Sequence, residues 1–255
     1  TSGSGGVINM ITGYSSTQSS GGLNIDSANA GSGGVSGRIQ IFTGHSDHGS
    51  SGIISMETGS SEYGQGGDIA VTVGFGNSGR GGGIRVQAGE AEGGRGGRVS
   101  VQSGISKADS TSGYIGARTS DGGLEGNSGA LILSTGLSRG DNSGAINILS
   151  GASTSEKQFG LTGDIIISVG DGNSGVGGNV QVTAGGNYGR DAESGGNVLM
   201  QTGKSELGSS GMVFVNTGNS GLDGTSGNLI FETGDASQGS SGEVIFQTGI
   251  ATFGK

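Results

Sequence analysis

A nine-residue repeat runs through this chain and constrains its fold more than any other feature. One copy is Ser36-Gly37-Arg38-Ile39-Gln40-Ile41-Phe42-Thr43-Gly44, and sixteen copies in the same frame extend from 5–13 to 241–249. With the nine places of each repeat numbered in order, place 2 is always glycine, place 4 always aliphatic and place 6 always apolar, while place 8 is small and most often threonine. Apolar residues two apart favour a short, half-buried β-strand. No segment shows the 3.6-residue period of a helix.

The connections between repeats favour a parallel arrangement of these strands. They are rich in Gly, Ser, Asn and Asp, which adopt turn conformations at low cost. About nine residues separate successive strands, whereas most β-hairpins use about two to five. The same residue types also return to the same loop places, as stacked coils require. The sequence therefore predicts an all-β fold, a parallel β-solenoid of sixteen strand-loop units, in preference to an antiparallel meander.

The spacing of the repeats predicts the size of one coil. Each interval runs from place 9 of one repeat to place 9 of the next. Seven of the eight odd-numbered intervals are 15 residues long, while the even-numbered intervals range from 15 to 19 residues. A longer duplication, of 66–79 in 162–175, is displaced by six repeats, an even number. We predict eight coils of about 31 residues, each with two strands, forming two facing parallel sheets about 38 Å long. The alternative is one strand per coil, which gives sixteen coils over about 77 Å.

The chain is expected to form a single solenoid domain over residues 1–255. Neither terminus carries a helix or a polar cap in the sequence, so we expect both ends to be uncapped. Bare strand edges recruit other chains. The stack would then continue in a longer chain, or subunits would stack end to end; the alternative is that the short tails suffice as caps.

An aliphatic ladder at place 5 predicts an interface. In the odd-numbered repeats place 5 is polar or small near the N-terminus and aliphatic from repeat 9 onward, and two even-numbered repeats add apolar residues near the same end. Contiguous exposed apolar surface often marks a contact with another chain. The candidate interface residues are Ile132, Ile166, Leu199, Phe214, Ile230 and Ile245.

Composition narrows the classes of function. Among 255 residues there are 63 glycines, no proline, cysteine or tryptophan, and a formal net charge of −9. This acidity argues against nucleic acid or an anionic membrane as a partner. No apolar run approaches the length of about 18 residues that a membrane span needs, so membrane insertion is not expected. The absence of cysteine rules out disulfides and thiolate metal sites.

Short catalytic patterns occur, but they fall on the loops of the repeat. Gly136-Leu137-Ser138-Arg139-Gly140 fits a nucleophile elbow without the strand-to-helix context that this motif needs. The runs 74–79 and 170–175 fit a dinucleotide-binding pattern, yet neither precedes a helix. We therefore predict no catalytic residues, no cofactor and no enzymatic activity.

The two histidines, His45 and His48, share one loop with Asp47. Two imidazoles and a carboxylate are able to hold a metal, but a solvated loop is the preferred interpretation. Calcium ladders of the β-roll kind need aspartate at a fixed loop place, which this repeat does not supply. No metal site is predicted.

The repeated pattern Ser-Gly-x-Φ-x-Φ-x-Thr-Gly, where Φ is apolar, resembles that of Gly/Ser-rich, β-roll-like solenoid proteins of algal and microbial surfaces. The resemblance implies a structural or scaffold protein, extracellular or at the cell surface, that self-associates into a filament, surface coat or larger assembly. The alternative is a surface-binding protein that presents a flat repetitive face to ice, mineral or polysaccharide.

Overall fold

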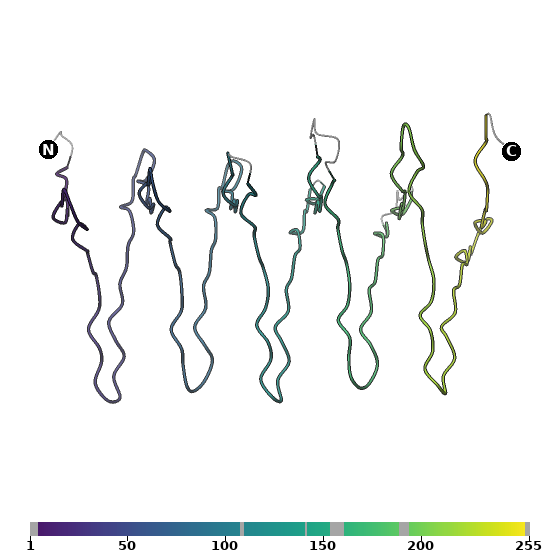
Figure 1. Cartoon of the computed structure of the whole chain (residues 1–255), viewed down its shortest axis with the longest axis horizontal. Coiled ribbons are helices and arrows are strands. Elements are labelled where there is room, and N and C mark those ends of the chain that lie inside the picture. Colours follow the sequence, from purple (N-terminus) through teal and green to yellow (C-terminus); the bar gives the residue numbers. More distant parts are fainter. Residues whose placement is uncertain (1–4, 108–109, 141, 154–160, 189–193, 253–255) are drawn as a thin grey trace. The chain divides into compact units, whose positions relative to one another are not determined.

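The computed structural model describes residues 5–107, 110–140, 142–153, 161–188 and 194–252 (Figure 1). The chain divides into two bodies, Thr1–Leu131 and Ile132–Lys255. Their boundary lies inside the ninth repeat, between place 4 and place 5. Both bodies are built from the same two parts, an extended nine-residue repeat and the loop that follows it (Figure 1).

The repeats are extended segments without strand pairing. Throughout the described ranges the backbone contains neither a helix nor a β-strand, and only the loops carry turns and bends. The predicted solenoid, its two-strand coil and its two facing sheets therefore remain predictions.

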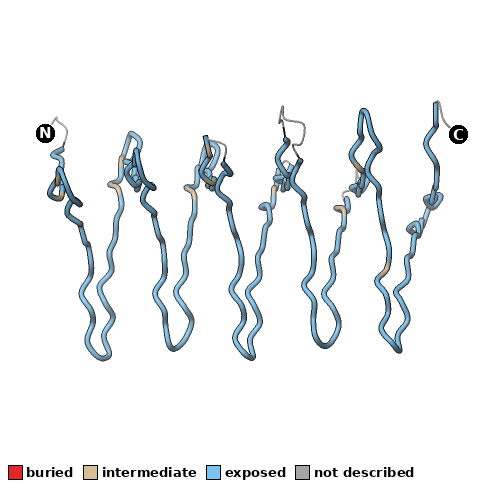
Figure 2. Tube along the Cα trace, viewed as in Figure 1, coloured by how far each residue is buried: buried red, intermediate tan, exposed pale blue. Residues whose placement is uncertain are grey.

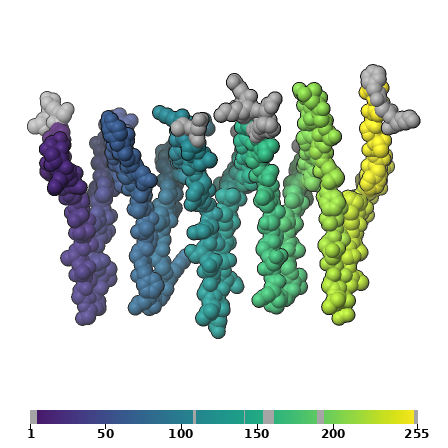
Figure 3. Space-filling view, in the orientation of Figure 1, coloured from purple at the N-terminus to yellow at the C-terminus, as the bar shows by residue number. Residues whose placement is uncertain are grey.

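The extended segments leave their side chains at the surface. Figure 2 marks none of the described residues as buried, and the space-filling view in Figure 3 shows the same exposed segments. The apolar residues of the repeat thus have no hydrophobic core within the described part of the chain. Exposed apolar surface on this scale favours association with further apolar surface, because burial is worth about 25 cal/mol per Å².

The alternation within the repeat still affects exposure. From repeat 2 onward the place-4 side chains are between 48% exposed, at Ile54, and 61% exposed, at Leu131. The rings of Phe231 and Phe246, at place 6 of the last two repeats, meet edge to face with centroids 6.2 Å apart. This contact joins place-6 side chains of neighbouring repeats, although place 6 is in general about as exposed as place 5, with 74% at Ile167 against 82% at Ile166. The inward orientation of place 6 stays a prediction.

The described loops show two local conformations, a bend and a β-turn. Eight loops of six residues bend at their third to fifth residues, namely at 16–18, 47–49, 62–64, 77–79, 92–94, 173–175, 206–208 and 237–239. Three loops of seven residues instead form a β-turn in which one glycine N–H donates to a glycine carbonyl three residues earlier: Gly34 to Gly31 at 3.1 Å, Gly126 to Gly123 at 3.1 Å and Gly224 to Gly221 at 3.5 Å. The bends follow odd-numbered and even-numbered repeats alike.

The long duplication in the sequence is also a duplication of backbone geometry. Gly79 and Gly175 occupy matching places in the two copies, and they have φ of 79° and 82°. A left-handed conformation of this kind is strained for residues that carry a Cβ atom. Equal sequence therefore produces equal local structure at these two loops.

Candidate functional site

The feature that recurs through the structure is a junction across each loop. An ideal Cβ built on the place-2 glycine of one repeat would lie 2.7–3.9 Å from the place-8 side chain of the preceding repeat at fifteen successive junctions. The tightest cases are Gly82 against Val73 and Gly178 against Val169, both at 2.7 Å from Cγ1. Real Cβ atoms do not approach so closely, so at these two junctions something must shift to accept a Cβ. At Gly163, Gly227 and Gly242 the same Cβ would make an ordinary van der Waals contact at 3.6–3.9 Å. Steric fit therefore explains the glycine at the tightest junctions.

Hydrogen bonds hold several of these junctions together. The Ser27 hydroxyl donates to the carbonyl oxygen of Gly37 at 2.8 Å, and the Thr58 hydroxyl donates to that of Gly67 at 3.0 Å. Five further loops are closed by the place-2 N–H, which donates to the place-9 carbonyl before the loop: Gly21 to Gly13, Gly97 to Gly89, Gly113 to Gly104, Gly196 to Gly185 and Gly211 to Gly203, all at 2.9–3.1 Å. The two ends of such a loop are therefore tied side by side.

The junctions are also the least exposed part of the chain (Figure 2). Eleven described residues are half-buried, and every one is a place-8 residue or the serine at the second place of a loop. They are Thr12, Ser15, Thr43, Ser46, Ala88, Ser103, Ser106, Ser138, Ala184, Thr202 and Thr217. Seven place-8 residues are thus half-buried at the junctions, and the other nine are exposed.

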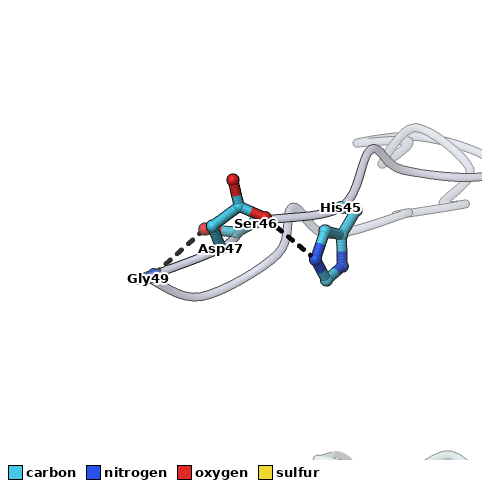
Figure 4. Close-up of polar contacts among 4 residues, drawn as sticks. All are labelled: His45, Ser46, Asp47 and Gly49. Carbon is cyan, nitrogen blue, oxygen red and sulfur yellow. Dashed lines mark hydrogen bonds and ion pairs between the residues drawn. The ribbon is translucent and has the colours of Figure 1, made fainter.

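Serine at the second loop place stabilises the bend that follows. The Ser46 hydroxyl accepts the N–H of Gly49 at 3.0 Å (Figure 4), and the Ser205 hydroxyl accepts that of Gly208 at 2.9 Å. Ser15 accepts the N–H of Gln18 in the same way at 2.9 Å. This three-residue spacing is typical of serine side chains that satisfy local backbone donors in turns.

Replacing Ser46 or Ser205 with alanine is expected to destabilise the loop by about 0.5–1.5 kcal/mol, because a backbone donor loses its acceptor. The expected readout is faster amide hydrogen exchange at Gly49 or Gly208, measured by NMR. Ser46→Thr is the matched control, since it keeps the hydroxyl. Equal exchange in Ser46→Ala and wild type would show that the hydrogen bond is not formed in solution.

The histidine loop is a bend with an ion pair across it. His45 Nε2 lies 3.2 Å from Asp47 Oδ1 (Figure 4), and both side chains are more than four-fifths exposed. Lys204 and Glu206 form the same pair at the same loop places, at 3.7 Å. Such exposed pairs contribute little to stability. Within the described residues no group of three or more His, Cys, Asp or Glu side chains is placed to hold a metal ion.

The six candidate interface residues are all strongly exposed. Their exposed fractions run from 70% at Ile230 to 84% at Leu199, above those of the place-4 side chains from repeat 2 onward. All six lie in the second body, and the structure shows no cluster that gathers them into one patch. Whether they form an interface thus depends on how the repeats stack.

The catalytic-looking motifs are accounted for by the loops. Ser138, of the elbow-like run, is half-buried at the same loop place as Ser15 and Ser46. The two dinucleotide-like runs contain Gly79 and Gly175, whose positive φ belongs to the loop bend. The sequence analysis did not identify the junction between place 8 and the next place 2, although the pairing of an invariant glycine with a small residue was its visible signal.

Comparison with family models, with curated proteins and with solved structures finds no match to this chain. In the part of the chain that the structure describes there is no helix long and apolar enough to cross a membrane.

Proposed function

We propose that the chain is a non-enzymatic structural or scaffold protein whose repeats stack as a parallel β-solenoid and which assembles into a filament, surface coat or larger complex. The observation that carries the proposal is the alternation of apolar side chains through sixteen repeats, which have no hydrophobic core in the described part of the chain. Stacking repeats would bury the place-4 and place-6 side chains, each worth about 1.5–3 kcal/mol. The apolar place-5 residues would then be left on the outside.

The place-5 residues supply the contact between chains in this proposal. Ile132, Ile166, Leu199, Phe214, Ile230 and Ile245 are outward by parity and strongly exposed. All six lie in the second body, whereas the odd-numbered repeats earlier in the chain have polar or small residues at the same place, and this distribution favours lateral packing of one protomer on another. An extracellular or cell-surface location is part of the proposal and rests on the resemblance to surface solenoid proteins.

The alternative of binding to ice or another flat surface has less support. A surface-binding solenoid would present ranks of threonine outward. Here the threonines of the repeat fall at place 8, where Thr12, Thr43 and Thr202 are half-buried at the junctions. They lie against the place-2 glycines of the next repeats. Assembly is therefore the better-supported function.

Changing Ile166, Leu199 and Ile230 together to serine is expected to disperse the assembly. Loss of the buried apolar area should raise the concentration at which chains associate by at least about tenfold, which corresponds to 1.4 kcal/mol. Sedimentation velocity across a concentration series, together with negative-stain electron microscopy, measures this change. The control is Asn9→Ser with Gln40→Ser, at the same place of earlier repeats. An unchanged association midpoint in the triple variant would overturn the proposed interface.

A further inference from the structure

Several features of the loops recur when the repeats are counted in threes. We name the loops after repeats 2, 5, 8, 11 and 14 the open loops: they are residues 29–35, 75–80, 121–127, 171–176 and 219–225. All three β-turns between glycines lie in open loops. Three of the four glycines with positive φ, Gly33, Gly79 and Gly175, lie there too.

We name the remaining ten loops the closed loops, and five of them carry the backbone bond between place 9 and the next place 2. None of these five bonds, as formed by the described residues, spans an open loop. The open loop 29–35 is spanned instead by the hydrogen bond from the Ser27 hydroxyl to the Gly37 carbonyl.

The three loop serines that accept a backbone N–H, Ser15, Ser46 and Ser205, also lie outside the open loops. Of the eleven half-buried residues, only Thr217 precedes an open loop. In the described part of the chain the closing backbone bonds and the accepting serines thus avoid every third loop, although 75–80 and 171–176 bend as six-residue closed loops do.

The sequence has the same period. The repeats that precede the open loops close at Ala28, Gly74, Ser120, Gly170 and Gly218, so their spacings are 46, 46, 50 and 48 residues. Valine stands at place 8 only in repeats 5 and 11, and both precede open loops. The long duplication is displaced by six repeats, which is a multiple of three as well as of two.

Stacked coils place loops of one conformation above one another, because each coil repeats the backbone of its neighbour. We propose that three successive repeats form one coil of about 46 residues, with three parallel sheets, and that the open loops line one edge along which a second copy of the chain docks. The two-strand coil predicted from parity alone would instead mix open and closed loops on the same edge. The docking half rests on the proposed assembly function, whereas the coil does not. In a three-repeat coil Ile166, Leu199 and Ile230 belong to three different sheets, so they do not form one ladder and the open-loop edge becomes the continuous apolar contact.

The chemistry of the open loops suits docking of a second copy. Each contains one large apolar residue that is at least 95% exposed: Val35, Phe75, Leu124, Val176 and Leu222. In a three-repeat coil these residues form a ladder with one rung every ~4.8 Å. A ladder with this spacing is matched along its length only by a partner with the same repeat, which the chain itself provides.

Charge favours the same edge. The five open loops together contain five Asp, Glu, Lys or Arg residues, whereas the five loops after repeats 3, 6, 9, 12 and 15 contain ten. Two copies of a chain with a net charge of −9 repel each other. Contact along the open loops therefore brings fewer charged residues together than contact along the loops after repeats 3, 6, 9, 12 and 15.

Cysteine pairs test the coil directly, because the natural chain has no cysteine. Residues 55, 70, 85 and 100 stand at place 5 of repeats 4 to 7. Neighbouring strands in register bring their Cα atoms to about 4.8 Å, within the range of about 4.4–6.8 Å that a disulfide needs. Three double variants therefore distinguish the coil sizes, and each contains Ser55→Cys. The second substitution is Ser100→Cys for a coil of three repeats, Arg85→Cys for two repeats and Ala70→Cys for one repeat.

Mild oxidation of each dilute double variant, followed by mass spectrometry of the linked peptides, is the measurement. The expected result is an intramolecular disulfide in the variant with Ser55→Cys and Ser100→Cys, at a yield at least tenfold above the other two. A preferred bond to residue 85 or 70, or no preferred bond in any variant, would overturn the three-repeat coil. The experiment uses monomeric protein, so it does not depend on assembly.

The docking edge is tested by changing Phe75, Leu124 and Leu222 to serine, with Leu137→Ser and Tyr188→Ser in closed loops as the control. We expect the loop variant to raise the association midpoint at least tenfold in sedimentation velocity, while the control leaves it unchanged. If the place-5 triple variant disperses the assembly and the loop variant does not, the docking edge is wrong and the proposed function stands. If wild-type protein does not associate, both fall.

Discussion

Replacing Ile165 or Ile167 with aspartate is expected to abolish or strongly weaken β-sheet formation, whereas the same change at Ile166 is not. These residues occupy places 4, 5 and 6 of repeat 11, with exposed fractions of 52%, 82% and 74%. In the proposed solenoid, places 4 and 6 point inward and place 5 points outward. Burying a carboxylate in an apolar interior costs several kcal/mol. In a chain of this size about 3 kcal/mol lowers the Tm by about 10 °C.

Circular dichroism with thermal melting measures this effect. The three variants serve as controls for one another, because each replaces an isoleucine with an aspartate and adds the same charge. Ile166→Asp should keep the β signal of the wild type and weaken association instead. Equal melting of all three variants would show that the alternate places are not on opposite faces of a strand. That result would remove the solenoid, whatever the number of repeats in a coil.

Gly82→Ala and Gly178→Ala are expected to destabilise the protein by about 1–3 kcal/mol each, the usual cost of overpacking a filled site. The added Cβ would lie 2.7 Å from Cγ1 of Val73 or Val169, so the junction has to open or the valine has to change rotamer. Gly74→Ala and Gly170→Ala are the matched controls at place 9. A Cβ there has no other atom within 4 Å, and neither glycine has positive φ.

Urea unfolding of the four variants, followed by circular dichroism, provides the comparison. The place-9 variants should be neutral or more stable by about 0.4–1 kcal/mol, since alanine restricts the unfolded chain. Adding Val73→Ala to Gly82→Ala should restore much of the lost stability by removing the clash. Equal losses at places 2 and 9 would mean that the junction does not form in solution.

Several local features follow from the sequence alone. Period-two alternation predicted extended repeats, and the described repeats are extended, because β-branched residues favour this backbone. Runs rich in Gly, Ser and Asn predicted the loops. Each bend depends on residues only a few positions apart in the chain, such as Ser46 and Gly49, so the local sequence is sufficient to predict it. The residues Ile132, Ile166, Leu199, Phe214, Ile230 and Ile245 were identifiable as outward by parity; their role as an interface stays a prediction.

Other features needed three-dimensional structure. The contact between place 8 and the next place 2 joins residues about ten apart across a loop, so no pattern within one repeat reveals it. Parity of the intervals suggested two kinds of loop in alternation. The proposed three-repeat coil starts instead from bonds such as those that join Gly13 to Gly21 and Gly89 to Gly97, which no open loop among the described residues contains. Parity alone does not predict where these bonds form, and the number of repeats in a coil stays a prediction.

The sequence by itself determined the repeat and its extended backbone, because these depend on neighbours along the chain. Only the tertiary structure decided which glycines are sterically required and which loops are closed. Steric fit and loop closure depend on distances between atoms that are remote in sequence, and only those distances show that a Cβ at Gly82 would meet Val73 while one at Gly74 would meet nothing within 4 Å.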